Sequence, residues 1–245
     1  MTSTPSVAPP DPSDLATPAT LAEVTQLWWF CDGAIMDVGT REQLHRSWGL
    51  CPRHAWLYFR AENDLKYQPL GNAVLYHDLA ARAVELLTSH HRSRTKWHRL
   101  AGADSCLTCD YVSTAAHGRD HFADDLATVR NGARTRDWFT GSIEVWQTRH
   151  CPRCPNTVPR DQAPPTDPAN GLPCRIHLLA DADEPDPGNV ADYLAALTDR
   201  HATCEKSMTV DGPARTANTD AALVEALAWF AGWPPAPGST TTSLA

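Results

Sequence analysis

The chain has little positive charge, and lysine is especially rare. Its 245 residues include 21 Lys and Arg side chains, of which only three are lysine, against 29 Asp and Glu, giving a formal net charge of −8. Phosphate neutralisation supplies most of the affinity of general nucleic-acid binders, so this charge argues against that class. The basic segment 90–99 is a local exception. It is either a cationic helix end that complements the helix dipole, or a contact site for an anion or a nucleic acid.

Export and membrane-spanning signals are also missing. The first basic side chain is Arg41, so no positively charged region precedes an apolar stretch near the start. No apolar run approaches the length needed to cross a bilayer. We therefore expect a cytoplasmic protein without membrane contact, whose eight cysteines stay reduced and available for metal.

Motifs of the common enzyme classes are absent as well. The sequence contains no serine-nucleophile motif, no glycine-rich phosphate loop and no dinucleotide-binding fingerprint. Enzyme classes that depend on these motifs therefore have no support from the sequence.

What the sequence does contain is cysteine and histidine in metal-binding spacing. Cys151-Pro-Arg-Cys154 is followed by a Pro-rich spacer and then by Cys174-Arg-Ile-His177. Only two residues separate the ligands of each pair, so one tight turn can direct both side chains at a single point. Three thiols and one imidazole form the Cys3His set that tetrahedral zinc accepts, with iron or an iron–sulfur cluster as the less favoured alternative.

The intervals of this set recur in the first half of the chain. Cys31, Cys51 and His54 repeat the spacing of the last three ligands, which indicates a duplicated module. The first module has Trp28 where the second has Cys151, so it lacks one ligand. Three alternatives follow: a distant residue completes the site, the site is empty, or an open position binds water or substrate. The candidates for a distant ligand are His45, Cys109 and Cys204.

A third pair, Cys106-Leu-Thr-Cys109, has two possible sets of partners. His117 and His121 are spaced one helical turn apart and would complete a separate Cys2His2 site. Alternatively, the pair supplies ligands to the first module. A redox-active Cys-x-x-Cys is less favoured, because the thioredoxin-like βαβ context is absent.

Apolar side chains recur with helical periodicity along most of the chain. The predicted helices cover 21–30, 40–48 with a capping box at its start, a segment beginning at Cys51 and His54, 69–90 with two apolar faces, 189–204, and 219–230. The segment 138–146 is either a short strand or a buried helical turn, and 156–170 is a loop. We predict a mainly α protein in which two helical zinc-binding modules, 19–105 and 106–232, pack as one unit. The Pro-rich tails 1–18 and 233–245 are expected to be disordered.

The segments Gly49-Leu-Cys-Pro-Arg-His-Ala-Trp56 and Pro69-Leu-Gly-Asn-Ala-Val-Leu-Tyr-His-Asp78 lie among Cys-x-x-Cys pairs. In this respect the chain resembles a family of uncharacterised, mostly actinobacterial Cys/His-rich proteins that form a domain of unknown function. That family repeats Cys-Pro-x-Cys with a later Gly-x-Cys-x-x-His, and the resemblance covers roughly residues 20–232. It implies a helical metal-binding fold without implying an activity. Trp28 departs from the pattern.

Three functions are compatible with these patterns. The leading hypothesis is an interaction or regulatory scaffold, held together by zinc, that binds a protein or small-molecule partner. The first alternative is a metal-dependent enzyme that uses the open position at Cys31, Cys51 and His54. Its proton carrier would be Glu42, His45 or His77, although His77 is more simply explained as a hydrogen-bonded core residue. The second alternative is a thiol-based redox or metal sensor.

Overall fold

The computed structural model describes residues 18–102, 105–115, 119–146, 149, 151, 153–154, 172–180 and 186–233. Within these ranges every regular element is a helix, which confirms the mainly α prediction. In chain order the elements are α1 (Leu21–Cys31), the 3-10 turn η1 (Ala34–Met36), α2 (Val38–Ser47), α3 (Pro52–Lys66), α4 (Leu70–Thr88), α5 (Ser93–Ala101), α6 (Leu107–Thr114), the 3-10 turn η2 (Asp120–Phe122), α7 (Ala123–Asn131), α8 (Ala133–Trp146), α9 (Arg175–Leu179), α10 (Pro187–Ser207) and α11 (Ala217–Ala231).

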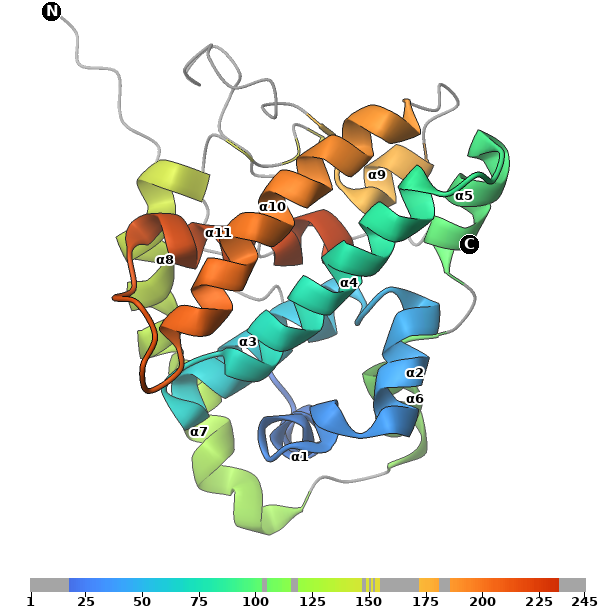
Figure 1. Ribbon diagram of the computed structural model, residues 1–245. Coiled ribbons are helices and arrows are strands. Elements are labelled where there is room, and N and C mark those ends of the chain that lie inside the picture. The colour runs from blue at the N-terminus through green and yellow to red at the C-terminus, as the bar shows by residue number, and fades with distance from the viewer. Residues whose placement is uncertain are drawn as a thin grey trace, which may run out of the picture.

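The two longest helices, α4 and α10, lie side by side and run in opposite directions (Figure 1). The predicted apolar stripe of α10, from Val190 to Cys204, is buried. On α4 only one of the two predicted faces is fully buried, because Ala81 is exposed and Val84 is half-buried. The face that includes Leu75 and Leu79 is the one that is buried in the core. These helices belong to different predicted modules and share one hydrophobic core, so the described parts of the modules pack as one unit.

Helix α11 lies at the centre of this core. From residue 221 to its end all of its side chains are buried, and it contacts α3, α4, α8, α9 and α10. Its small alanines allow neighbouring helices to approach closely on every side. A helix that is apolar all round is stable in water only when it is enclosed in this way.

An aromatic cluster joins the end of α11 to α3 and α8. The ring centroids of Trp56 and Trp233 are 5.2 Å apart, and those of Trp146 and Trp233 are 5.0 Å apart. The Nε1–H of Trp56 also donates to the carbonyl of Gly232 at 2.8 Å. Trp233 therefore belongs to the core, which corrects its assignment to a disordered tail. The remainder of that tail, like residues 1–17 and the predicted loop 156–170, lies outside the described residues.

Three helices begin earlier than the sequence predicted: α11 begins at Ala217 instead of residue 219, and α2 and α10 begin after caps that lie upstream of the predicted ones. Helix α2 is capped by Asp37, whose carboxylate accepts from the Thr40 amide at 2.9 Å, so Thr40 lies inside the first turn. Helix α10 is capped by Asp186, with Pro187 in the first turn, rather than by Asn189. In both cases an aspartate three residues upstream takes the capping position. The segment 138–146 is the second half of α8, so the helical alternative is right.

Candidate metal centres

Four of the predicted ligands meet at the start of two helices, and we call this group site 1: Cys51, His54, Cys106 and Cys109. Cys51 is the N-cap of α3 and His54 lies in its first turn, as predicted. Cys106 and Cys109 hold the equivalent positions on α6. Of the two alternatives predicted for Cys106 and Cys109, the structure shows the second, in which the pair joins Cys51 and His54 of the first module. All four ligand atoms lie within 4.8 Å of one another.

The second group, site 2, contains the four residues predicted from spacing alone: Cys151, Cys154, Cys174 and His177. Cys174 is the N-cap of the short helix α9, and His177 lies in the turn that follows. Cys151 and Cys154 face them from the turn beyond α8. The Cys154 and Cys174 sulfurs are 3.7 Å apart, and the His177 Nδ1 lies 3.3–3.5 Å from all three sulfurs.

The interatomic distances in both groups fit a single tetrahedral ion. In site 1 the His54 Nδ1 lies 3.3 Å from the Cys51 and Cys109 sulfurs and 3.5 Å from that of Cys106. The Cys51 and Cys109 sulfurs are 3.8 Å apart. Zinc at its usual bond lengths from sulfur and nitrogen gives tetrahedral edges of about 3.8 Å between sulfurs and about 3.6 Å between sulfur and nitrogen. Either set of side chains could therefore hold such an ion with little rearrangement.

We call two ligands that are separated by two residues a hook. The Cys-x-x-His hooks of the two sites have the same local geometry. Cys51 has φ −64° and ψ 164°, and Cys174 has φ −64° and ψ 163°. Both precede a helix, and both histidines present Nδ1 to the sulfurs. The order of the hooks is reversed, however, because the Cys-x-x-His pair comes first in site 1 and second in site 2. The two sites are therefore alike in the geometry of their Cys-x-x-His hooks, but they differ in the order of their ligands along the chain.

Cys31 does not belong to site 1, which corrects the predicted ligand set. It is the last residue of α1, and the charged groups with the largest effect on its thiol are Glu62 and Lys66. Glu62 lies eight residues beyond His54 on α3, which is about 12 Å along the helix axis. Burial, together with the charge of Glu62, raises the pKa of Cys31 well above its ordinary value. Cys31 is spaced from Cys51 as Cys154 is from Cys174, but only Cys154 belongs to a metal-binding group.

The other candidates for a distant ligand can now be separated. Cys109 is the one of the three that reaches site 1. The ring of His45 pairs with the carboxylate of Asp78 instead. Cys204 is fully buried in α10, in agreement with its interpretation as a core residue. Trp28, at the position of the missing ligand, packs against Phe122 with ring centroids 5.2 Å apart.

The histidine partners proposed for Cys106 and Cys109 are not used in the described structure. His121 is exposed on η2, where its ring lies against Phe122. His117 lies outside the described residues. The i, i+4 spacing of the two histidines therefore did not identify the partners of Cys106 and Cys109, whose sulfurs meet His54 at the start of α3 instead.

The proton carriers considered for an enzyme are also placed elsewhere. Glu42 is exposed on α2. His77 bonds through Nδ1 to Glu205 at 2.9 Å, and its ring stacks on that of His201, with centroids 6.0 Å apart. Neither these residues nor His45 belong to either of the two groups found among the described residues.

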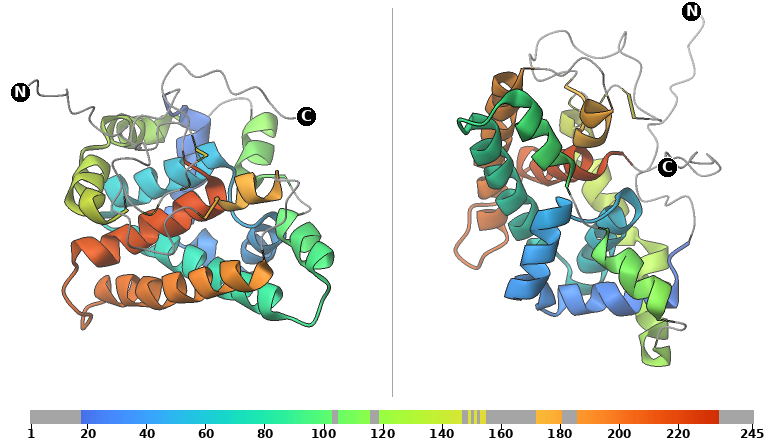
Figure 2. Two further views of the ribbon diagram at one scale, coloured as in Figure 1. Left: turned by 90° about the horizontal axis from the view of Figure 1, so that it is seen from above. Right: turned by 90° about the vertical axis from the view of Figure 1, so that its right-hand side faces the viewer.

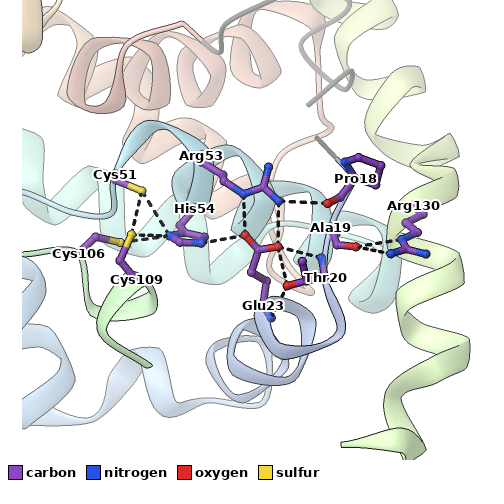
Figure 3. A network of polar contacts seen from close by, with 10 residues as sticks. All are labelled: Pro18, Ala19, Thr20, Glu23, Cys51, Arg53, His54, Cys106, Cys109 and Arg130. Atoms are coloured by element: carbon purple, nitrogen blue, oxygen red, sulfur yellow. Dashed lines mark hydrogen bonds and ion pairs between the residues drawn. The ribbon is translucent and has the colours of Figure 1, made fainter. Parts of the chain in front are cut away.

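One functional residue was missed by sequence reasoning: Glu23 on α1. Its carboxylate lies between His54 and Arg53, and the ring of His54 presents its opposite edge to the three sulfurs (Figure 3). The His54 Nε2 to Glu23 Oε1 distance is 3.0 Å, and Arg53 donates to both carboxylate oxygens at 2.6 and 2.9 Å. A carboxylate in this position fixes the orientation of a metal-binding imidazole and the choice of its ligating nitrogen. The Thr20–Glu23 capping box was the signal in the sequence that α1 begins here.

The electrostatics of Glu23 fit this role. Its side chain is 5% exposed, so burial by itself would raise the pKa of the carboxyl group. Hydrogen bonds from His54 and Arg53 outweigh burial and hold this pKa well below its ordinary value. Thr20 adds two further hydrogen bonds, from its amide at 2.8 Å and its hydroxyl at 2.9 Å. Glu23 is therefore a fixed negative charge behind His54.

Among the described residues, the groups that support site 2 belong to the core. The Trp233 amide donates to the Cys154 sulfur at 3.3 Å. Arg175, next to Cys174, is buried and donates to the carbonyls of Phe230 and Leu100, each at 3.1 Å. The surroundings of site 2 thus connect α9 to the ends of α5 and α11.

One thiol in each group is predisposed to ionise. A hydrogen bond from Cys51 lowers the pKa of Cys106 to about 3, and hydrogen bonds from Cys154 and Cys174 lower that of Cys151 far below its ordinary value. Burial would lower the pKa of His54, but hydrogen bonds with Cys106 and Glu23 raise it to about 9. Each group therefore contains one thiol that ionises readily at the place where a cation would sit. Because each offers four ligand atoms from side chains, this arrangement corresponds to a closed site rather than an open catalytic one.

Comparisons with protein-family models, with curated proteins and with solved structures found no match to this chain. Within the described residues, no helix has both the length and the apolar character required to cross a membrane. The residues themselves therefore carry the functional argument, and they define a helical chain with two Cys3His groups able to hold a metal ion.

Proposed function

We propose that the protein binds two zinc ions, one in each site, and that these ions stabilise a helical scaffold that interacts with a protein or small-molecule partner. The observation that supports this most directly is the agreement of the distances in both groups with the edges of a zinc-centred tetrahedron. Sulfur and imidazole ligands in tetrahedral geometry favour zinc among the common divalent ions.

A single ion fits these groups better than an iron–sulfur cluster. In a 4Fe–4S cluster each cysteine binds a different iron, and in a 2Fe–2S cluster the ligands divide into two pairs on two irons, so four ligands of a cluster spread over a larger distance than those of one ion. In each group here all four ligand atoms lie within 4.8 Å of one another. Sulfur separations of 3.7 and 3.8 Å are those of neighbouring ligands on one centre. The eight cysteines are all free of disulfides, so every thiol in both groups is available for metal.

The positions of the two sites support a structural role for zinc. Site 1 joins the start of α3 to the start of α6, and through Glu23 it also engages α1 (Figure 3). Site 2 joins the turn after α8 to α9 and, through Cys154, to the segment after α11. The enzyme hypothesis depended on a missing ligand beside Cys51 and His54, and Cys106 and Cys109 supply ligands there.

Metal analysis of the purified protein tests the proposal. We expect two zinc ions per chain, and a strong chelator should remove them with loss of helical circular dichroism, since metal binding contributes to folding. The variant Cys31→Ala should retain both ions, because Cys31 lies outside site 1. Fewer than two ions per chain, or loss of one ion from Cys31→Ala, would contradict the proposed sites. Full retention of structure after chelation would contradict the scaffold role.

A further inference from the structure

A cavity of about 650 Å³ opens between α2, α4 and α5, and none of its lining residues belongs to either metal site. The right-hand view of Figure 2 faces this side of the molecule, where α5 and the end of α4 lie above α2. Six of the lining side chains are basic or imidazole groups: His45, Arg46, Arg82, His91, His98 and Arg99. The volume falls within the range typical of pockets for small molecules.

The charge of this cavity is opposite to that of the chain. Three arginines line it against one carboxylate, Glu85, although the whole sequence has a net charge of −8. A cavity wall enriched in one sign of charge raises the local concentration of ions of the other sign. The segment 90–99, which stood out in the sequence, contributes three of the six groups.

Compensation of helix dipoles explains only part of this charge. His45 and Arg46 lie in the last turn of α2, and α5 has the same arrangement with His98 and Arg99. Arg82, however, lies six residues before the end of α4, where the dipole has little effect. It has no hydrogen bond or ion pair with any described residue, so its guanidinium is available to a ligand.

The walls of the cavity are fixed by contacts between the helices. Trp48 ends α2 with a left-handed φ of 57°, which is unusual for a large side chain, and its Nε1–H donates to the Arg99 carbonyl at 2.8 Å. Arg99 in turn contacts the His91 Nε2 through Nη1 at 3.0 Å. Gly102 has a φ of +83°, and a Cβ there would lie 3.0 Å from the Arg46 carbonyl oxygen. The basic groups are therefore held on a defined frame.

We propose that this cavity binds a small molecule that carries two or more negative charges, as phosphate groups or as several carboxylates. Guanidinium groups form paired hydrogen bonds with both of these anions. The buried side chains of Trp48 and Leu86 add apolar surface to the lining of the cavity. The inference is independent of the metal sites, because no ligand of either site lines the cavity.

Calorimetric titration at low ionic strength tests the proposal with two probes, inorganic pyrophosphate and citrate. We expect saturable binding of at least one probe with one site per chain, and weaker binding as salt is added. Arg82→Gln should weaken it about tenfold or more, the usual size of a lost charge-assisted contact. Arg94→Gln is the matched control, because Arg94 is an exposed residue of α5 that does not line the cavity. Binding of one probe alone supports the proposal and identifies which anion the site prefers.

Three results would overturn it. Neither probe binds saturably; Arg94→Gln weakens binding as much as Arg82→Gln; or a single-stranded oligonucleotide binds more tightly than both probes and loses affinity equally in the two variants. The last result would indicate a diffuse basic surface. Zinc content and helical circular dichroism, measured on both variants, separate these outcomes from failure of the metal sites or of folding.

Discussion

Sites 1 and 2 present the same ligands in nearly the same geometry, but they are supported differently. Site 2 has its three cysteines buried at 6%, 4% and 1% exposure, and core groups surround them. In site 1 Cys109 is exposed, Cys51 and Cys106 are half-buried, and a buried carboxylate supports His54. The comparison shows that one hook design can be stabilised either by packing or by a polar network. The two modes should respond differently to mutation.

The largest expected effect is the loss of a ligand from site 2. Cys174→Ser should lower the free energy of unfolding by roughly 4 kcal/mol or more, because it weakens metal binding within the core. Cys109→Ser, at the exposed edge of site 1, should cost about half as much. Urea unfolding curves, together with zinc analysis, measure both effects.

A matched control for these variants is Cys204→Ala. Cys204 is a buried thiol on α10 outside both sites, so this variant should keep two zinc ions and lose only ~1 kcal/mol of stability. If Cys109→Ser destabilised the protein as much as Cys174→Ser, the two sites would contribute equally to the fold. The distinction between a packed site and a peripheral site would then fail.

The two sites also differ in how far the sequence could predict them. Site 2 was predictable because its two hooks lie close in sequence, with Cys154 and Cys174 twenty positions apart. Site 1 draws its hooks from α3 and α6, and the choice among Cys31, His117 and the α3 hook as partners for Cys106 depends on tertiary contacts. The matched interval to Cys31 favoured the wrong ligand, because spacing along the chain does not fix where the end of α1 packs along α3.

The helices were predictable to a similar degree. Apolar periodicity identified α1, α4, α10 and α11, since a buried stripe must recur at the helical period. Several starts were misplaced, because Asp37 and Asp186 compete with nearby Thr and Asn as caps. Burial of Trp233 and the position of Glu23 beside His54 arise from packing between distant segments, which no local pattern encodes.

A smaller effect should distinguish the polar network of site 1. Glu23→Gln should weaken zinc binding at site 1 by about tenfold to a hundredfold, as is usual for loss of a carboxylate behind a ligating histidine. One of the two zinc ions should then leave at a lower chelator concentration, while the second is released as in the wild type. Chelator titration with a chromophoric indicator resolves the two steps.

Loss of the cap on α1 must be separated from loss of the carboxylate. Thr20→Ala removes the capping hydroxyl, together with its hydrogen bond to the Glu23 carboxylate, and leaves the contacts of Glu23 with His54 and Arg53 in place. It should cost ~1 kcal/mol of stability without changing the release of zinc. Equal shifts in release for Thr20→Ala and Glu23→Gln would show that Glu23 acts through the helix cap alone.

The smallest expected effect concerns the loss of folding stability at low pH. Both the core and the metal sites can contribute to this loss. His201 is fully buried on α10, and neither ring nitrogen has a hydrogen-bond partner in the described part of the chain. Burial, reinforced by the charges of His77 and Arg200, lowers the pKa of His201 to about 3. The unfolded chain binds a proton here below about pH 6.5, whereas the folded protein does not.

The sign of the effect follows from this difference in proton binding. The contribution of neutral His201 to stability is complete above about pH 6.5 and declines by about 1.4 kcal/mol per pH unit as the pH falls toward 3. His201→Leu removes this titrating group from the core. When the pH is lowered from about 7.5 to 5.5, the free energy of unfolding of the variant should therefore decrease by ~1 kcal/mol less than that of the wild type. Protonation of the zinc ligands affects both proteins alike, so the difference between their urea midpoints isolates His201. Identical pH dependence in the two proteins would show that His201 makes no contribution to the acid sensitivity of the fold.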